Sequence, residues 1–164
     1  MSVRSAAGTT IEISAGVPET FDVDGYEALE FTEIGEVTNP GEFGREYALI
    51  THTPVKSRGT RKFKGSFNEG QLSMQLALDE EDAGQQLCMT ALDDDADYAF
   101  CVTSQAGNKY YFSAQVMSFT RQFGEADSIN SATIQLEITT SADGVGVVAD
   151  IVEGAAPPAP APAP

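Results

Sequence analysis

Tryptophan is absent from this chain, histidine occurs once and cysteine twice, and each scarcity excludes a class of site. Zinc sites need clusters of cysteine and histidine at short spacing, which Cys88 and Cys101 do not form. Both cysteines are flanked by apolar residues, so we expect two buried thiols that stay reduced in the cytoplasm. The single histidine, His52, has no evident partner for general acid–base catalysis, and we expect it to be an ordinary loop residue.

Catalytic motifs and long hydrophobic runs are also missing. The chain has no serine nucleophile elbow, no phosphate-binding loop, no dinucleotide fingerprint and no metal-binding helix motif. We therefore predict no catalytic residues, no metal ligands and no cofactor, and an enzyme is the weakest hypothesis. No run of about 18 apolar residues is present that could cross a membrane, and the N-terminal residues lack the apolar segment of a secretory signal.

Basic residues are few and unevenly placed. Nine Lys and Arg stand against 25 Asp and Glu, so the formal net charge is −16, and such a surface repels DNA and anionic membranes. Five of the nine nevertheless lie in one short segment without acidic residues: Lys56, Arg58, Arg61, Lys62 and Lys64. A nucleic-acid-binding patch is one interpretation. The acidity of the remaining chain favours an exposed loop that binds an acidic partner, including a second copy of the protein.

Alternation of apolar and polar residues predicts that most of the chain is β structure. The segment 28–38 also has a glutamate at every third position, as a helix could, but Gly35 and the β-branched residues favour a strand with a bulge. The turn 105–108 joins two of the predicted strands into a hairpin, and the loop Pro54–Gly59 joins two others. The predicted strands are residues 28–38, 47–53, 60–67, 72–78, 98–102, 109–123 and 132–138.

One helix is predicted after the strand at 72–78. Asp79 is suited to cap it, and the acidic residues 80–82 suit the positive end of the helix dipole. The side chains expected to pack on the sheet recur at four-residue spacing: Ala83, Leu87 and Ala91. The acidic run Asp93–Asp95 ends the helix. A solvated turn is favoured there over a calcium loop, because the glycine and distal glutamate of an EF-hand are missing.

A change of composition divides the chain near residue 140. Residues 1–140 are predicted to form one domain, and residues 141–164 a Gly/Val-rich and then Ala/Pro-rich tail. Ala155–Pro164 contains only alanine and proline, a composition that favours polyproline II and forms no core. We expect the tail to be flexible and dispensable for the fold.

A series of short fragments, taken together, gives the strongest functional signal. The fragments are Phe31–Thr38, Gly41–Tyr47, Thr51–Val55, Arg61–Asn68, Leu72–Leu78, Asp82–Gln85 and Tyr111–Phe119. Their order and spacing, from about Ile11 to Thr139, resemble the lambda-like major tail tube proteins of siphophages. Each fragment is weak alone, and the complete set is specific.

The resemblance implies a mainly β fold, a β-sandwich or barrel with one flanking α-helix, and a structural protein of the virion tail. Subunits of that family form hexameric rings that stack into a hollow tube, assembled in the host cytoplasm, through which genomic DNA passes without specific binding. The implied partners are other copies of the chain, tail terminator, and tail tip or tape measure proteins. The lambda relative has an additional C-terminal immunoglobulin-like domain. Because only residues 140–164 follow the matched region, we expect that domain to be missing here.

Two sets of residues receive roles from this hypothesis. A long loop in related tube proteins joins successive rings, which assigns inter-ring contact to Lys56, Arg58, Arg61, Lys62 and Lys64. Small polar side chains suit a wall along which DNA slides, and an acidic one repels phosphate. The candidate lumen-facing residues are Ser73, Gln75, Thr133, Gln135 and Glu137.

Two alternatives stay open. The inner tube of a contractile tail or secretion-like machine would have a similar fold, and the sequence separates it poorly from a siphophage tube. A small-ligand-binding β-barrel would have the same alternating strands but would stay monomeric, so self-association distinguishes it.

Overall fold

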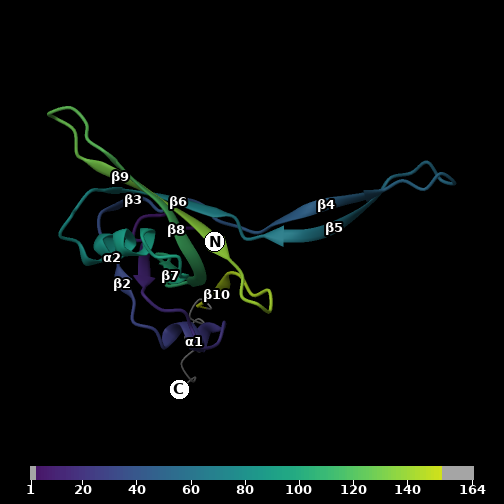
Figure 1. Cartoon of the computed structure of the whole chain (residues 1–164), viewed down its shortest axis with the longest axis horizontal. Coiled ribbons are helices and arrows are strands. Elements are labelled where there is room, and N and C mark those ends of the chain that lie inside the picture. Colours follow the sequence, from purple (N-terminus) through teal and green to yellow (C-terminus); the bar gives the residue numbers. More distant parts are fainter. Residues whose placement is uncertain (1–2, 153–164) are drawn as a thin grey trace, which may run out of the picture.

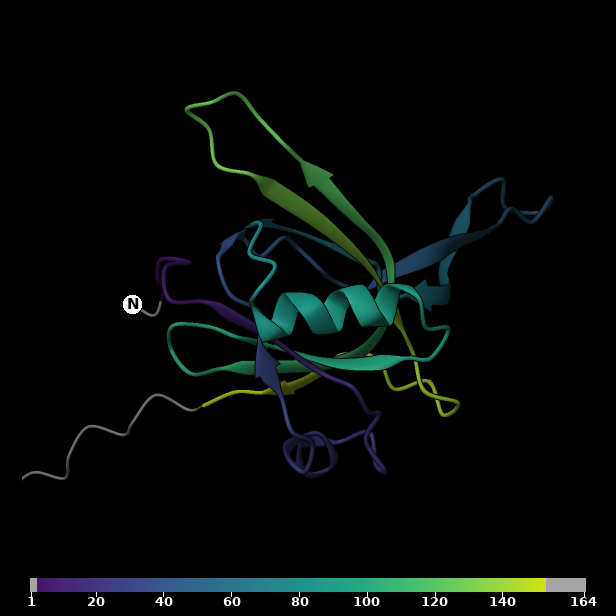
Figure 2. The ribbon, with the colours of Figure 1, turned by 60° about the vertical axis from the view of Figure 1, so that its left-hand side comes forward.

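The computed structural model describes residues 3–152, which form ten strands and two helices (Figures 1 and 2). In chain order they are β1 (Thr10–Ser14), α1 (Val23–Glu27), β2 (Thr32–Glu33), β3 (Val37–Asn39), β4 (Glu46–His52), β5 (Arg61–Asn68), β6 (Gln71–Ala77), α2 (Ala83–Leu92), β7 (Tyr98–Thr103), β8 (Lys109–Gln122), β9 (Ser131–Thr139) and β10 (Val148–Asp150).

Eight strands form one antiparallel sheet in the order β2-β1-β7-β8-β9-β6-β3, with β10 also paired to β8. The long strand β8 connects the two halves, because its first residues pair with β7 and its later residues pair with β9. A bulge between Val116 and Ser118 interrupts the second pairing, and bulges bend and twist a strand. The sheet curls into a half-barrel around the larger of two hydrophobic core clusters. The mainly β fold with a flanking helix, predicted from the sequence, is confirmed (Figure 2).

The core fills the inside of this curl. Alternate residues of β6 and β9, among them Leu72, Met74 and Ile134, are fully buried, as the period-2 pattern predicts. Phe100 of β7 stacks on Phe112 of β8, with 5.7 Å between the ring centroids. Each such side chain stabilises the fold by about 1.5–3 kcal/mol relative to exposure.

Helix α2 covers the core, but its N-cap lies three residues after Asp79, the residue that was predicted to cap it. Asp82 is the N-cap, because its carboxylate accepts hydrogen bonds from the backbone N–H of Gln85 at 2.9 Å and of Gly35 at 3.1 Å. Asp79 instead accepts from the N–H of Glu81 in the preceding turn. One carboxylate therefore starts the helix and ties it to the segment between β2 and β3.

The face of α2 that is buried differs from the predicted face. Gly84, Gln85, Cys88 and Ala91 are buried, whereas Leu87 is half-buried against the core and Ala83 is exposed. Gln85 was not expected inside. Its amide is satisfied by donating to the Gly35 and Ala77 carbonyls and accepting from the Asp79 N–H. A small Gly84 and a hydrogen-bonded Gln85 let the helix lie close to the sheet, which apolar periodicity alone does not reveal.

The segment 28–38 is two short strands, β2 and β3, and not one bulged strand. Extended structure is interrupted between them around Gly35 and Glu36, and Glu36 has a left-handed backbone with φ 58°. Upstream, α1 was not predicted, and it is only five residues long. Its Tyr26 is buried, stacks on Tyr111 and makes a hydrogen bond of 3.1 Å with the Ser113 hydroxyl.

The packed structure continues past Thr140. Strand β10 pairs with residues 109–111 of β8, and Val147 and Val148 pack against the two core clusters. The first part of the predicted tail, residues 141–152, thus contributes to the fold, and Ala155–Pro164 lies outside the described residues. Neither helix in residues 3–152 has the length and hydrophobicity needed to cross a membrane.

Candidate assembly surfaces

Strands β4 and β5 leave the body as a separate two-stranded sheet (Figure 1). They pair from Glu46 opposite Asn68 out to His52 opposite Arg61, so the predicted strands around the loop Pro54–Gly59 are confirmed. At the end of the hairpin the Pro54 carbonyl accepts hydrogen bonds from the backbone N–H of Ser57 and Arg58. We call residues 46–68 the arm.

All five clustered basic residues lie on the arm. Lys56 and Arg58 are in its terminal turn, and Arg61, Lys62 and Lys64 are on β5. All five are exposed, and none makes an ion pair within residues 3–152. The Lys64 ammonium lies 4.9 Å from the centre of the Tyr47 ring, a cation–π contact that holds it along the hairpin. The structure thus gathers positive charge on one projection of an acidic molecule.

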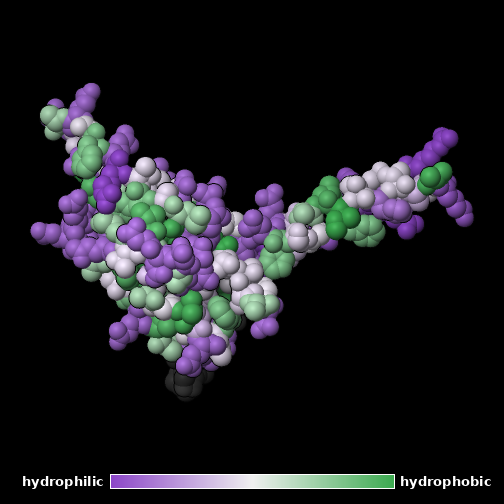
Figure 3. Space-filling model, viewed as in Figure 1, coloured by the Kyte–Doolittle hydropathy of each residue, from purple (hydrophilic) through white to green (hydrophobic). Residues whose placement is uncertain are grey.

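The arm also exposes large apolar side chains, which the basic pattern did not suggest. Leu49 is 66% exposed, Ile50 52%, Phe63 53% and Val55 97%, and they form green areas along the arm in Figure 3. Within residues 3–152, no further layer covers either face of this hairpin. Exposed apolar area on a projecting element marks an interaction surface, and an isolated two-stranded hairpin is only marginally stable.

An ion pair between the exposed Arg45 and the buried Glu69 lies at the base of the arm. The Glu69 side chain is only 2% exposed, and it accepts from both Nε and Nη2 of Arg45, with Nε at 2.7 Å. The Arg45 guanidinium also lies 4.0 Å from the centre of the Phe67 ring. Hydrogen bonds to the Tyr47 hydroxyl and to Glu69 raise the pKa of Arg45 above its ordinary value. Sequence reasoning missed this pair, although Arg45 was a rare basic residue outside the cluster.

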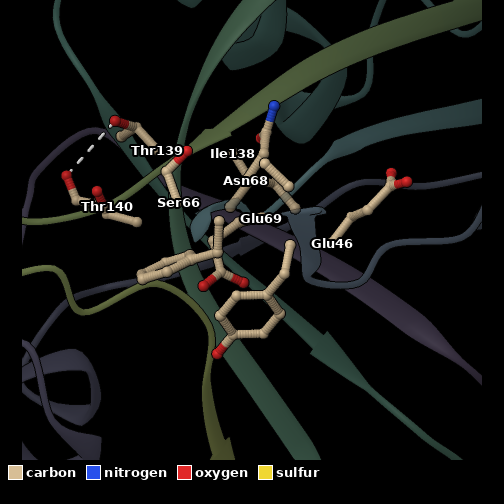
Figure 4. Close-up of a pocket in the computed structure, with 10 residues that line it drawn as sticks. Glu46, Ser66, Asn68, Glu69, Ile138, Thr139 and Thr140 are labelled. Atoms are coloured by element: carbon tan, nitrogen blue, oxygen red, sulfur yellow. Dashed lines mark hydrogen bonds between the residues drawn. The ribbon is translucent and has the colours of Figure 1, made fainter. Parts of the chain in front are cut away.

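Glu69 also meets the C-terminal part of the fold. A Cβ on Gly146 would collide with the Glu69 side chain, so a larger residue there would displace Glu69 from its present position. Beside the pair is a hollow of about 520 Å³ where the arm meets the end of β9, lined by Glu46, Tyr47, Ala48, Ser66, Phe67, Asn68, Glu69, Ile138, Thr139 and Thr140 (Figure 4).

Along β6, β9 and the part of β8 that pairs with β9, the outer face of the sheet is mainly polar and almost uncharged. Ser73, Gln75, Gln135 and Glu137 are exposed and Thr133 is half-buried, while the residues between them in β6 and β9 form the core. The register places Ser73 opposite Gln135 and Gln75 opposite Thr133. Strand β8 extends the rows, with Gln115 beside Glu137, Ser118 beside Gln135 and Thr120 beside Thr133. The candidate residues thus share one continuous surface, to which β8 adds three members that sequence reasoning missed.

The two thiols are separate and buried. Cys88 lies under α2 in the main core, and burial, with the nearby Asp82 carboxylate, raises its pKa to about 12. Cys101 lies in the smaller cluster around Tyr26, and burial raises its pKa as well. Among residues 3–152 no cluster of His, Cys, Asp and Glu is arranged to hold a metal ion.

No protein-family model matches the chain, and no curated protein matches it in sequence. Solved structures share its fold. A chain of the tail of an empty gene transfer agent particle, solved with C6 symmetry, has a TM-score of 0.62 at 11% identity, over 85% of this chain and 96% of that one. A chain of the PVC sheath–tube complex, an extracellular contractile injection system in its extended state, has a TM-score of 0.60 at 13% identity. That match covers 92% of this chain and 93% of the other. The SPP1 tail tube has a TM-score of 0.56 at 11% identity, over 87% of this chain and 76% of that one.

These similarities cover most of the chain at low identity. They show that the chain has the fold found in tail and injection-tube assemblies, in agreement with the mainly β fold expected from the sequence.

Proposed function

We propose that this chain is the major tail tube subunit of a long-tailed bacteriophage of the lambda-like type. Copies form hexameric rings, and the rings stack into a hollow tube that conducts the genome from capsid to host. The observation that carries the proposal is the fold shared over most of the chain with a tail chain solved in C6 symmetry.

The surfaces of the chain support the same role. An arm with uncovered apolar and basic side chains needs a partner, and the acidic remainder of another copy supplies the opposite charge. The polar, nearly uncharged face of β6, β8 and β9 suits the lumen wall, because it offers no cationic groups to hold phosphates. In this proposal Lys56, Arg58, Arg61, Lys62 and Lys64 contact the next ring, and the virion tail is the location of the assembled protein.

Ring formation also solves a problem of the isolated subunit. The half-barrel ends in the short strands β2 and β3, whose outer edges have no neighbour in the described sheet. Closure of a ring of sheets removes such edges. Tail terminator and tail tip or tape measure proteins would bind the two ends of the finished tube.

The test is assembly of the purified full-length protein at rising concentration, followed by sedimentation and negative-stain microscopy. We expect six-fold rings and stacked tubes with a central channel. A chain that stays monomeric at high concentration contradicts the proposal and would favour the ligand-binding barrel. That alternative has little support, because the inside of the curl is filled by buried side chains such as Phe100, Phe112 and Ile134.

The inner tube of a contractile machine is the second candidate, favoured by the similarity to the PVC sheath–tube complex. The two candidates differ in what covers the tube. A virion or particle whose tube is enclosed by a second, contractile layer would identify the contractile machine, and a bare tube would identify the siphophage tail.

A further inference from the structure

A second projection stands on the opposite side of the body from the arm (Figures 1 and 2). It is the end of the β8–β9 hairpin, residues 123–130, which we call the tip. All eight residues are exposed, with Phe123 at 67% and Ile129 at 80%, although both are large and apolar. Glu125 and Asp127 lie between them, and the tip contains no basic residue.

The tip has a defined shape. The Glu125 carbonyl accepts hydrogen bonds from the Ser128 backbone N–H at 3.0 Å and from the Ser128 hydroxyl at 2.8 Å. Gly124 lies so close to that hydroxyl that a Cβ would collide with it. The two apolar side chains are thus presented on a closed turn with two carboxylates between them.

One face of the arm has the complementary composition. The β4–β5 register places Leu49 opposite Lys64 and Thr51 opposite Lys62, so both lysines lie on the face that carries Leu49. A shallow hollow on the arm is lined by Tyr47, Ala48, Leu49, Lys62, Phe63 and Lys64. Leu49, Lys62 and Lys64 are all exposed there.

We propose that the tip of one copy binds this face of the arm of the next copy. Phe123 and Ile129 would cover Leu49 and the Tyr47 ring, while Glu125 and Asp127 would pair with Lys62 and Lys64. The inference rests on the proposed function, and it names the partner surface that the arm binds. Apolar burial supplies the attraction, and the four charges select the partner and its orientation.

Geometry favours a second copy as the occupant. The two surfaces lie on opposite sides of one chain, so a single molecule cannot join them to each other (Figure 1). Two different surfaces that pair between identical subunits form a head-to-tail contact, which generates rings or filaments. The other acidic turn, after α2, fits the arm less well. The run Asp93–Asp95 has only Leu92 beside it, which is 38% exposed, and no aromatic side chain equivalent to Phe123.

A charge exchange tests the pairing. The arm variant K62E/K64E and the tip variant E125K/D127K should each remain folded but yield no pelletable assemblies under conditions where the parent polymerises. Mixed in equal amounts, they should regain assembly, because each altered arm then meets an altered tip. D93K/D95K is the matched control with the same change of charge on the other acidic turn, and it should assemble like the parent.

Cross-linking checks the contact directly. L49C mixed with F123C should give a disulfide-linked dimer under mild oxidation, since Cys88 and Cys101 are buried, whereas V17C mixed with F123C should not. The inference is overturned if the parent assembles while the mixture of charge variants does not, or if tubes form without the 49–123 cross-link. A parent that never assembles overturns the proposed function, and the inference with it.

Discussion

At the scale of single residues, the thiols are buried, and the buried polar groups of Gln85 and Glu69 have partners. Both cysteines are buried, and the buried amide of Gln85 has three hydrogen-bond contacts. The one ion pair among the described residues is the Arg45–Glu69 contact at the base of the arm. These placements lead to two predictions.

The first prediction concerns the thiols. Because burial raises the pKa of Cys88 to about 12, the thiol is almost entirely protonated at pH 8, and thiolate is the reactive form. We expect an aromatic disulfide reagent to modify neither cysteine rapidly in the native protein at pH 8, and to modify both at once in denaturant. Fast native labelling of Cys88 would contradict its position under α2.

The second prediction concerns Gly84. Replacement of glycine by alanine within a helix normally adds up to about 1 kcal/mol of stability. Here a Cβ would collide with the Glu33 carbonyl oxygen and lie 2.6 Å from the Ile34 Cα, so G84A should lower the free energy of unfolding by about 1–3 kcal/mol. Thermal melts of G84A beside T90A, an exposed position of the same helix, provide the comparison. T90A should stay within about 0.5 kcal/mol of the parent.

At the scale of elements, the alternating strands could be predicted, and the helix face and short elements could not. Strands β6, β8 and β9 appear within one or two residues of their expected bounds, because each has one buried and one open face. The buried face of α2 depends on Gly84 and Gln85, which apolar periodicity does not select. Likewise, α1 and β10 are too short for periodicity and are fixed by contacts with β8.

The arm is also an element whose shape could be predicted and whose chemistry only partly could. The turn and the basic cluster were evident from residues 54–64, but the apolar faces were not, because Leu49, Ile50 and Phe63 resemble ordinary core residues of a strand pair. Their exposure is a tertiary property, because no other element of residues 3–152 covers the arm.

The third prediction tests the arm as an inter-ring contact. The variant R58E/R61E/K62E should fold like the parent but form no long tubes, because its arm would repel the acidic body of the next ring. Each exposed pair contributes only about 0–1 kcal/mol, but six copies act at each interface in the proposed hexamer. Raised salt should weaken tube formation by the parent, since it screens exposed charges. R4E, an exposed reversal away from the arm, is the control, and normal tube length in the triple variant would contradict the assignment.

The fourth prediction concerns the segment after Thr140. A chain ending at Val152 should melt like the parent, whereas one ending at Thr140 should melt at a lower temperature. The shorter chain loses β10, the packing of Val147 and Val148, and the Gly146 backbone that covers Glu69. Equal melting temperatures would show that residues 141–152 do not stabilise the fold.

At the scale of the whole molecule, charge is separated by surface. The formal net charge is −16, yet the arm carries five basic residues and the outer face of β6, β8 and β9 carries mainly serine, threonine and glutamine. In the proposed tube this arrangement leaves the acidic groups to meet arms or solvent and gives DNA a wall without cations.

The fifth prediction tests that wall. T133K/Q135K should still form tubes, but these should retain double-stranded DNA at low salt and release it as salt rises. Q86K/T90K places the same charges on the exposed side of α2 and serves as the control. DNA retention can be measured by co-sedimentation. If the control tubes retain DNA and the T133K/Q135K tubes do not, the face of β6, β8 and β9 does not line the lumen.

The uncovered hairpin has a consequence for the time course of assembly. Among residues 3–152, β4 and β5 have no core of their own, and such a hairpin is only marginally stable. Arm residues that become ordered only on first contact would each cost about 1–2 kcal/mol in conformational entropy. The first few copies would therefore associate weakly. A subunit that joins an existing ring makes several contacts while the entropy of only one arm is lost. Polymerisation should show a lag that disappears when preformed ends are added. If the proposed tube forms in this way, most subunits would stay free in solution until a first ring is present.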